Sequence, residues 1–323
     1  MRLISITLCV CLCLISVCGR ADRTYIQTQR KEQIQRDGKV HLTGCGKPTE
    51  PLKVSTFSTN PPFGWTEIVP ETGRYTSKGF GVDKIKEITK DLNIYTRAVG
   101  FQTDEEAFKA FQSGKIDILV GQYYNPKLRG DGHTYLTPSL FQNVISVVFM
   151  KGKEKEVRKF KELIGLKGVV RKDELFYSYI YPLLPKELQI EQVIDSKEAF
   201  SKLITGEADY LLASPYSAEA EARRFKINQD IVMTPVPLLG QELFVLYSKN
   251  SMCPEYRKSI AKKLKEKKQD TKALSRELIN YIDVWGQRFR DDPPLTQELY
   301  PNAQEESPIP ENNEISKATE EVK

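Results

Sequence analysis

The sequence predicts an α/β protein with two similar halves, each a mostly parallel sheet flanked by helices. Residues 79–124 alternate helical and strand patterns, which is typical of consecutive βαβ units. Within them, residues 116–120 form an apolar run broken only by Asp117, as expected of a strand buried on both faces. The order helix, glycine, aspartate, apolar strand at 110–120 recurs at 201–213. This repetition predicts the second half.

The first half is predicted from periodicity and from the residues that end its helices. Val82, Ile85 and Ile88 recur with helical spacing, and Gly114 is a typical residue just beyond the end of a helix. We therefore expect a strand at 52–57, a helix from 79, a strand at 94–99, a helix from 104 to 113 and a strand at 116–120.

The second half is predicted in the same way. Residues 143–150 are rich in β-branched side chains and predict a long strand. We then expect a strand at 167–170, a helix that opens near Asp173, a strand at 191–194, a helix capped by Ser196, a strand at 208–213, a returning strand at 241–247 and helices between 254 and 289.

The two ends of the chain differ from the middle. Residues 1–21 have the pattern of a secretion signal, with a basic start, a short apolar run and small residues at the cleavage site. Lipid attachment at Cys18 is the alternative, but Val17 precedes it where a small residue is usual. Residues 22–51 are a polar extension, and residues 291–323, with nine acidic and two basic side chains, predict a disordered acidic tail.

Composition excludes several functions. The formal net charge is +5, but no basic cluster is interleaved with aromatic residues, so nucleic acid is not an expected partner. The sequence contains two histidines, His41 and His133, which leaves little for a Ser-His-Asp or Cys-His arrangement. No cysteines and histidines have the spacing of metal ligands, so we expect neither a metal nor a cofactor.

Two cysteines, Cys45 and Cys253, lie outside the predicted signal. An even number of cysteines in an exported protein favours a disulfide, which here would join the polar extension to the start of the last helical region. The alternative is a pair of free thiols.

Three motifs in this order resemble the bacterial extracellular solute-binding proteins of family 3. They are the turn Asn60-Pro-Pro-Phe63, the helix opening Gly79-Phe-Gly-Val-Asp83 and the segment Phe111-Gln-Ser-Gly-Lys-Ile-Asp117. The resemblance extends over residues 52–249. It implies a two-lobed periplasmic-binding-protein-like fold, with lobe 1 at 52–143 plus 248–290 and lobe 2 at 144–247. In the family, the predicted strands at 143–150 and 241–247 correspond to the two strands that cross between the lobes.

The resemblance also implies a function. Members of the family capture a small polar solute, an amino acid or a similar molecule, between two lobes, and deliver it to an inner-membrane ABC permease. We therefore expect a monomeric periplasmic receptor that binds its ligand and does not transform it. The alternative is a periplasmic enzyme on the same fold, similar to the cyclohexadienyl dehydratases, with Glu174, Glu242 or Asp173 as the catalytic acid.

The resemblance places the ligand site in the cleft between the lobes, with two departures from the family pattern. Family members hold a carboxylate with an arginine two residues after the proline of Gly-x-x-x-x-Pro-x-Arg, but that position here is Leu128, and the arginine is Arg129. The aspartate that holds the α-amino group is replaced by Ser214. The expected ligand contacts are Asn60, Phe63, Trp65, Gln122, Tyr123, Arg129, Arg171, Asp173, Ser214 and Tyr216.

Overall fold

The computed structural model describes residues 45–172, 181, 184–267 and 271–301. The chain divides into Met1–Cys45 and Gly46–Lys323, and the described helices and strands lie in the second part. The predicted secretion signal lies outside the described residues. None of the helices within the described ranges has the length and apolarity needed to span a membrane.

Nine of the described strands form one large sheet built from two parallel blocks. The sheet order is β5-β1-β6-β12-β7-β10-β8-β9, and β11 also pairs with β7. The first block is β5 (Thr96–Ala98), β1 (Leu52–Thr56) and β6 (Ile118–Tyr123), and the second is β10 (Tyr210–Ala213), β8 (Lys167–Arg171) and β9 (Gln189–Val193).

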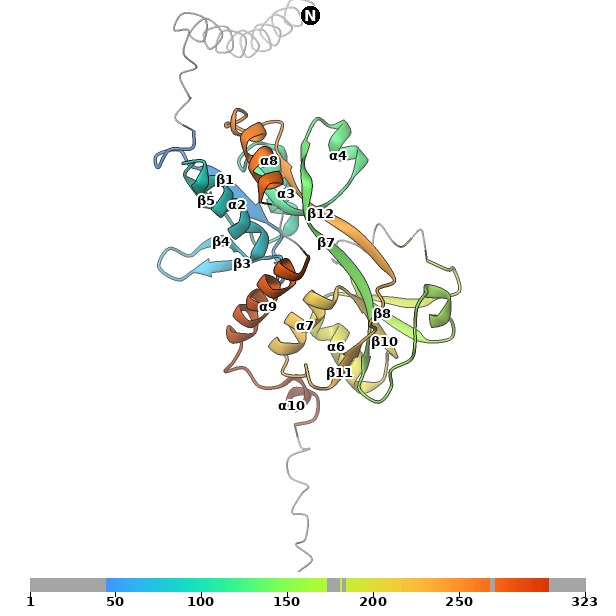
Figure 1. Ribbon diagram of the computed structural model, residues 1–323. Helices are drawn as coiled ribbons and strands as arrows, with labels where there is room; N and C mark the ends of the chain where they lie inside the picture. The colour runs from blue at the N-terminus through green and yellow to red at the C-terminus, as the bar shows by residue number, and fades with distance from the viewer. Residues whose placement is uncertain (1–44, 173–180, 182–183, 268–270, 302–323) are drawn as a thin grey trace, which may run out of the picture. The chain divides into compact units, whose positions relative to one another are not determined.

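Two long antiparallel strands connect these blocks. They are β7 (Thr134–Met150) and β12 (Leu239–Tyr247), which pair with each other. Strand β12 also pairs with β6 of the first block, whereas β7 pairs with β10 of the second block and with β11 (Ile231–Met233). Figure 1 shows β7 and β12 running from one lobe into the other. The predicted two-lobed α/β fold with two crossover strands is therefore confirmed.

Helices cover both parallel blocks. The elements are α2 (Phe80–Asp91), α3 (Asp104–Gln112), α4 (Pro126–Gly130), α6 (Ser196–Thr205), α7 (Pro215–Arg224), α8 (Tyr256–Glu266), α9 (Thr271–Gln287), α10 (Leu295–Leu299) and a short 3₁₀ helix at Phe160–Leu163. In the first lobe, α2 packs on β1 and β5, α3 packs on β6, and α8 packs on α2. In the second lobe, α6 packs on β8 and β10, while α9 packs on α7.

The internal repeat has a structural basis in two aspartates. The backbone N–H of Asp117 donates to the carbonyl oxygen of Lys53, and its Oδ2 accepts from the N–H of Lys53 at 2.8 Å. Asp209 makes the same two bonds with Lys167, where the side-chain bond is 2.7 Å. In each lobe the aspartate before a strand thus fixes the start of the neighbouring parallel strand.

Several local expectations need correction. A three-stranded antiparallel sheet of β2 (Thr59–Asn60), β3 (Gly64–Val69) and β4 (Arg74–Lys78) forms where only a turn was expected. The first crossover strand begins at Thr134, nine residues early, because its first residues pair with the end of β12. The cap of α6 is Asp195 and not Ser196, since the Asp195 side chain accepts from the N–H of Glu198.

Part of the predicted disordered tail is ordered. Leu295–Leu299 form α10, and the Leu295 side chain is buried in the core of the second lobe. The N–H of Leu295 donates to the carbonyl of Phe225, and Lys197 pairs with Glu298. Leu299 packs against the same core, so two apolar side chains and these contacts hold a short helix that the acidic composition of the segment did not indicate. Residues 302–323 lie outside the described residues.

The cysteine prediction is confirmed in the structure. Cys45 and Cys253 are both disulfide-bonded and buried. Tyr247 at the end of β12 donates its hydroxyl proton to the carbonyl oxygen of Cys253. The C-terminal helical region is therefore tied to the end of the second crossover strand just before α8 begins.

Candidate solute-binding site

Three neutral side chains form a hydrogen-bonded chain across the junction of the lobes. Ser214, just after β10, donates from Oγ to Oδ1 of Asn143, and Asn143 Nδ2 donates to the hydroxyl oxygen of Tyr123, each at 2.7 Å. All three residues are buried. Asn143 lies midway along β7, so it can reach the end of β10 on one side and the end of β6 on the other. The structure brings Ser214 and Tyr123 to one place, as predicted.

Gln122 adds a donor at the end of β6. Its side chain is buried, and its Nε2 has no hydrogen-bond partner among the described residues. An unpaired buried amide is costly, commonly by about 1–3 kcal/mol, so this position favours a hydrogen-bond acceptor.

Arg171 carries positive charge to the junction from the second lobe. It ends β8, is buried, and donates from Nη2 to the carbonyl oxygen of Thr59 in the first lobe at 2.9 Å. Its Nη1 donates to Ser196 Oγ at 3.2 Å. Nearby, Ser217 Oγ donates to Oδ1 of Asn60 at 3.3 Å. Asn60 and Arg171 therefore lie at the contact between the lobes, as predicted, whereas Asp173 lies outside the described residues.

Aromatic rings fill the apolar side of the same junction. The ring centroid of Phe63 lies 5.2 Å from that of Phe141 and 6.1 Å from that of Tyr216. Phe141 and Tyr216 are 5.3 Å apart. Phe63 and Tyr216, both predicted ligand contacts, thus pack against each other across the lobes.

Two predicted contacts are placed elsewhere. Trp65 is 1% exposed and packs against Trp285 of α9 at 5.4 Å, with its Nε1 donating to Glu67. Arg129 is exposed on α4, whereas Leu128 is buried. Figure 1 shows α4 at the end of the first lobe that is remote from β8 and β10. Neither side chain is among those that meet at Arg171 and Ser214.

A buried acid was missed by sequence reasoning. Glu221 of α7 is 4% exposed and pairs with Arg224 at 3.2 Å. Burial raises the pKa of Glu221, and the charges of Arg224 and Arg171 offset part of that rise. Glu221, Arg171 and Ser217 line a cavity of about 20 Å³, which has room for about one water molecule. Its sequence context, a polar helix, gives no sign of burial.

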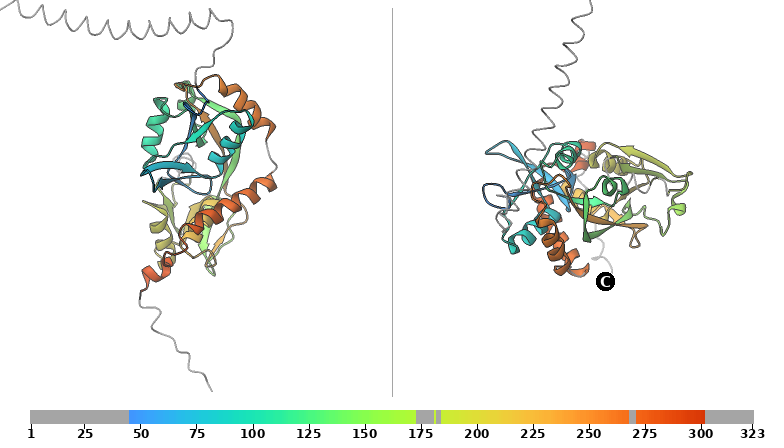
Figure 2. Two further views of the ribbon diagram at one scale, coloured as in Figure 1. Left: turned by 90° about the vertical axis from the view of Figure 1, so that its left-hand side faces the viewer. Right: turned by 90° about the horizontal axis from the view of Figure 1, so that it is seen from above.

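Helix α9 links the two lobes on one side of the junction. It packs on α7, yet Glu277 pairs with Lys84 of α2 at 3.0 Å and Tyr281 donates to Asp83 at 3.1 Å. Arg288, just beyond α9, pairs with Glu67 of β3 at 3.4 Å. The views in Figures 1 and 2 show α9 alongside α7 and next to the first lobe.

The chemistry available at the junction is recognition by hydrogen bonds, one guanidinium and aromatic packing. Within the described residues, no group of three or more His, Cys, Asp or Glu side chains is arranged to hold a metal ion. Asn143, Ser217 and Glu221 join the set that the sequence predicted. The sequence could have indicated Asn143, because it is a polar residue at the start of the apolar run that was assigned to the crossover strand.

Comparison with solved structures supports the two-lobed fold. The holo ArgBP structure from T. maritima superimposes with a TM-score of 0.51 at 20% identity, over 70% of this chain and 94% of that one. AbpA from Streptococcus pneumoniae, bound to L-arginine, gives 0.54 at 17% identity over 75% and 96%. The GluR0 ligand-binding core with L-glutamate gives 0.55 at 16% identity over 73% and 97%. Identities this low establish a shared fold. No curated protein sequence matches the chain.

The model of one protein family matches most of the chain. It is that of the bacterial extracellular solute-binding proteins, family 3, and the match runs over residues 52–281, which include both lobes and the crossover strands. The chain belongs to the bacterial extracellular solute-binding proteins, family 3.

Proposed function

We propose that this protein is an exported receptor that captures a small polar solute, an amino acid or a similar molecule, between its lobes. The observation that carries this proposal is the convergence of Arg171, Asn60, Ser214 and Asn143 from both lobes and a crossover strand. The family, and the arginine or glutamate named in the related structures, support an amino-acid-like solute. The predicted signal at residues 1–21 supports export to the periplasm.

Binding would follow from rotation of the lobes about β7 and β12, with lobe boundaries near residues 143 and 247. In the structure Arg171 donates to the carbonyl oxygen of Thr59. A solute carboxylate would replace that carbonyl as a stronger, charged acceptor. The buried Nε2 of Gln122 would donate to a second solute oxygen.

The partners of such a receptor are its solute and an inner-membrane ABC permease, and we propose that the receptor acts as a monomer without a cofactor. We also propose that it is not an enzyme. Of the acids that a lyase would need, Asp173 and Glu174 lie outside the described residues. Glu242 is exposed and accepts a hydrogen bond from Ser139 at 2.9 Å. The position of Glu242 therefore gives no reason to prefer a role in acid–base catalysis to a structural role.

A thermal-shift screen of the ligand-stripped protein against amino acids, polyamines, short peptides and aromatic acids tests the proposal. At about a hundred times its dissociation constant, a true ligand adds about 2.7 kcal/mol of stability. The affinity of the hit should fall at least tenfold in Arg171→Gln, while Arg158→Gln, a change at an exposed arginine, serves as the matched control. A panel without any shift, or turnover of a prephenate-like acid, would contradict the proposed function.

A further inference from the structure

A second, larger cavity is lined by Phe141, which also takes part in the aromatic contacts of the junction. Its volume is about 330 Å³, against about 20 Å³ for the cavity beside Arg171. It is enclosed by one face of α2, by residues 138–142 of β7, by β12 and by the facing parts of α8 and α9. Small-molecule sites commonly begin at about 300 Å³, so this cavity can hold a solute of modest size.

The floor of the cavity is apolar. Phe80 and Ile88 from α2, Leu140 and Phe141 from β7, Leu264 from α8 and Leu274 from α9 all line it. An apolar cavity of about 150 Å³ already binds benzene, so a branched aliphatic side chain fits within this volume. The floor therefore favours a ligand with an apolar side chain.

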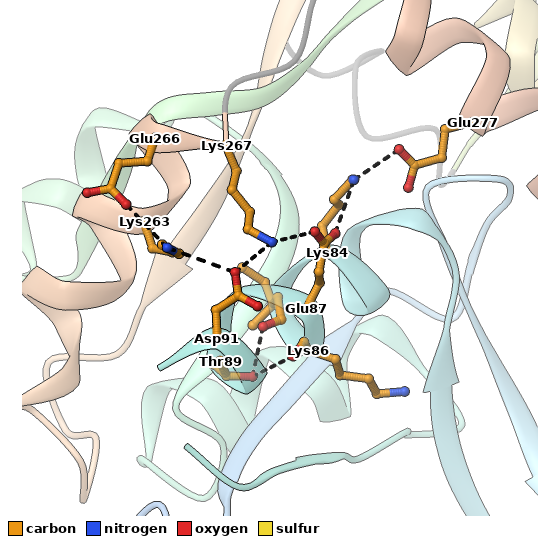
Figure 3. A network of polar contacts seen from close by, with 10 residues as sticks. Lys84, Lys86, Glu87, Thr89, Asp91, Lys263, Glu266, Lys267 and Glu277 are labelled. Atoms are coloured by element: carbon orange, nitrogen blue, oxygen red, sulfur yellow. Dashed lines mark hydrogen bonds and ion pairs between the residues drawn. The ribbon is translucent and has the colours of Figure 1, made fainter. Parts of the chain in front are cut away.

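The helix side of the cavity carries positive charge. Lys84 and Lys267 line it, and Figure 3 shows both in a network with Glu87, Asp91 and Glu277. Lys267 donates to Glu87 at 2.5 Å and to Asp91 at 2.8 Å. An ammonium group has three N–H donors, so Lys267 keeps one for a further acceptor. These pairs raise the pKa of Lys267 and keep it charged.

The strand side of the cavity carries the opposite charge. Glu242 of β12 lines it, and one carboxylate oxygen accepts from Ser139 Oγ at 2.9 Å. The other oxygen has no hydrogen-bond partner among the described residues. A molecule in the cavity would thus meet ammonium groups from the helices, a carboxylate from the strands and an apolar floor between them.

We propose that this cavity is a second solute site, distinct from the junction at Arg171, and that it takes a small zwitterion with an apolar side chain, such as a branched-chain α-amino acid. The solute carboxylate binds Lys267, and the solute ammonium binds Glu242. Because residues 138–142 and Glu242 belong to the two crossover strands, the occupant contacts the strands about which the lobes would rotate. Occupancy therefore biases the orientation of the lobes.

Calorimetric titration of the full chain with L-leucine tests this site. Two matched probes accompany it: 4-methylpentanoate, which lacks the ammonium group, and 3-methylbutylamine, which lacks the carboxylate. We expect leucine to bind at least tenfold more tightly than either probe. The acid probe leaves Glu242 without an ammonium donor, and the amine probe leaves the third N–H of Lys267 without an acceptor. Equal affinities of leucine and the two probes would overturn the assignment of a zwitterionic ligand.

Substitutions of residues that line the cavity test whether leucine binds there. Glu242→Gln should weaken leucine binding about tenfold, and Leu274→Trp, which fills the cavity, should abolish it. Glu156→Gln, at an exposed acid paired with Arg158, is the control for the charge change. Because the tryptophan variant could unfold, its melting transition is measured alongside, and Glu242→Gln remains informative by itself.

The same titration in Arg171→Gln separates the two sites. Leucine binding that persists in Arg171→Gln, weakens about tenfold in Glu242→Gln and disappears in Leu274→Trp supports the second site. Leucine binding that disappears in Arg171→Gln and survives both cavity variants overturns it and leaves the proposed receptor function intact. If wild-type protein does not bind leucine but binds another solute from the screen, the cavity proposal fails and the receptor proposal stands.

Discussion

The two lobes contain the same local unit in different surroundings. Each unit is a helix, a glycine at positive φ, an aspartate that bonds the neighbouring strand, an apolar strand and a helix that begins with proline. In the first lobe the segment after β12 covers this unit: Asn250 Nδ2 donates to the carbonyl oxygen of Gln112, and Ser251 Oγ donates to Oδ1 of Asp117. In the second lobe the corresponding Gly206 and Asp209 are exposed. The same motif therefore contributes a different amount of stability in each lobe, because tertiary contacts cover the first-lobe copy and leave the second-lobe copy exposed.

The two glycines should show the largest difference. Gly114 and Gly206 have φ of +77° and +79°, so alanine is strained at both positions. A Cβ on Gly114 would also overlap the backbone carbonyl oxygen of Asn250, whereas the nearest atom to a Cβ on Gly206 is Lys153 Nζ at 3.7 Å. We expect Gly114→Ala to lower the free energy of unfolding by about 4 kcal/mol and Gly206→Ala by about 1 kcal/mol.

Urea unfolding of the two glycine variants measures this difference. Equal losses of unfolding free energy at the two positions would show that the positive φ alone destabilises the alanine variants. The overlap with Asn250 would then be relieved at no cost in stability.

The two aspartates should differ by a smaller amount. Asp117 is 3% exposed and accepts from both Lys53 N–H and Ser251 Oγ, so Asp117→Ala leaves buried donors without an acceptor. Asp209 is exposed, and water can replace its bond from Lys167 N–H. We expect losses of about 3 kcal/mol for Asp117→Ala and about 1 kcal/mol for Asp209→Ala.

Thermal unfolding followed by circular dichroism measures both aspartate variants. A larger loss of stability in Asp209→Ala than in Asp117→Ala would contradict this comparison. It would show that solvent exposure does not decide how much the aspartate bond contributes to stability.

The smallest expected effect concerns the helices that follow the two strands. The second-lobe helix α7 carries the buried Glu221, whereas α4 of the first lobe contains no acid. The pKa of Glu221 is raised by burial, so between its unfolded and folded pKa the folded state binds more protons. The contribution of Glu221 to stability is therefore fully present below its unfolded pKa, near 4.5, and is lost as pH rises towards the folded pKa.

Stability measured against pH for wild type and Glu221→Gln isolates this contribution. The stability of wild type relative to Glu221→Gln should fall as pH rises above about 4.5, the ordinary pKa of a glutamate. Glu219→Gln, a partly exposed acid on the same helix, is the control. A relative stability that instead increases with pH would mean that pairing with Arg224 outweighs burial.

The elements that the sequence predicted well are those specified by local pattern. The apolar runs beside Asp117 and Asp209 define strands through residue type and spacing alone, so both parallel blocks were expected. The β2–β4 sheet and α10 were missed because they depend on distant partners, such as the contact of Leu295 with Phe225. Local composition cannot report such contacts.

The same limit applies to the candidate site. Arg171, Asn60, Ser214, Phe63 and Tyr216 were expected, and all lie at the junction, because each follows directly after a strand or belongs to the first turn. Trp65 follows the same turn, yet it is covered by α9. Ser217 and Glu221 were missed because burial of a polar residue on a helix depends on how the second lobe meets its neighbours.

The contact between Trp65 and Trp285 gives this protein a built-in optical reporter. The chain contains two tryptophans, and their rings meet between β3 of the first lobe and α9, which is packed on the second lobe. All intrinsic indole emission therefore arises at one contact, where β3 of the first lobe meets α9. A separation of β3 from α9 would hydrate both rings together and shift the emission to longer wavelength, so that opening can be followed in solution without a label.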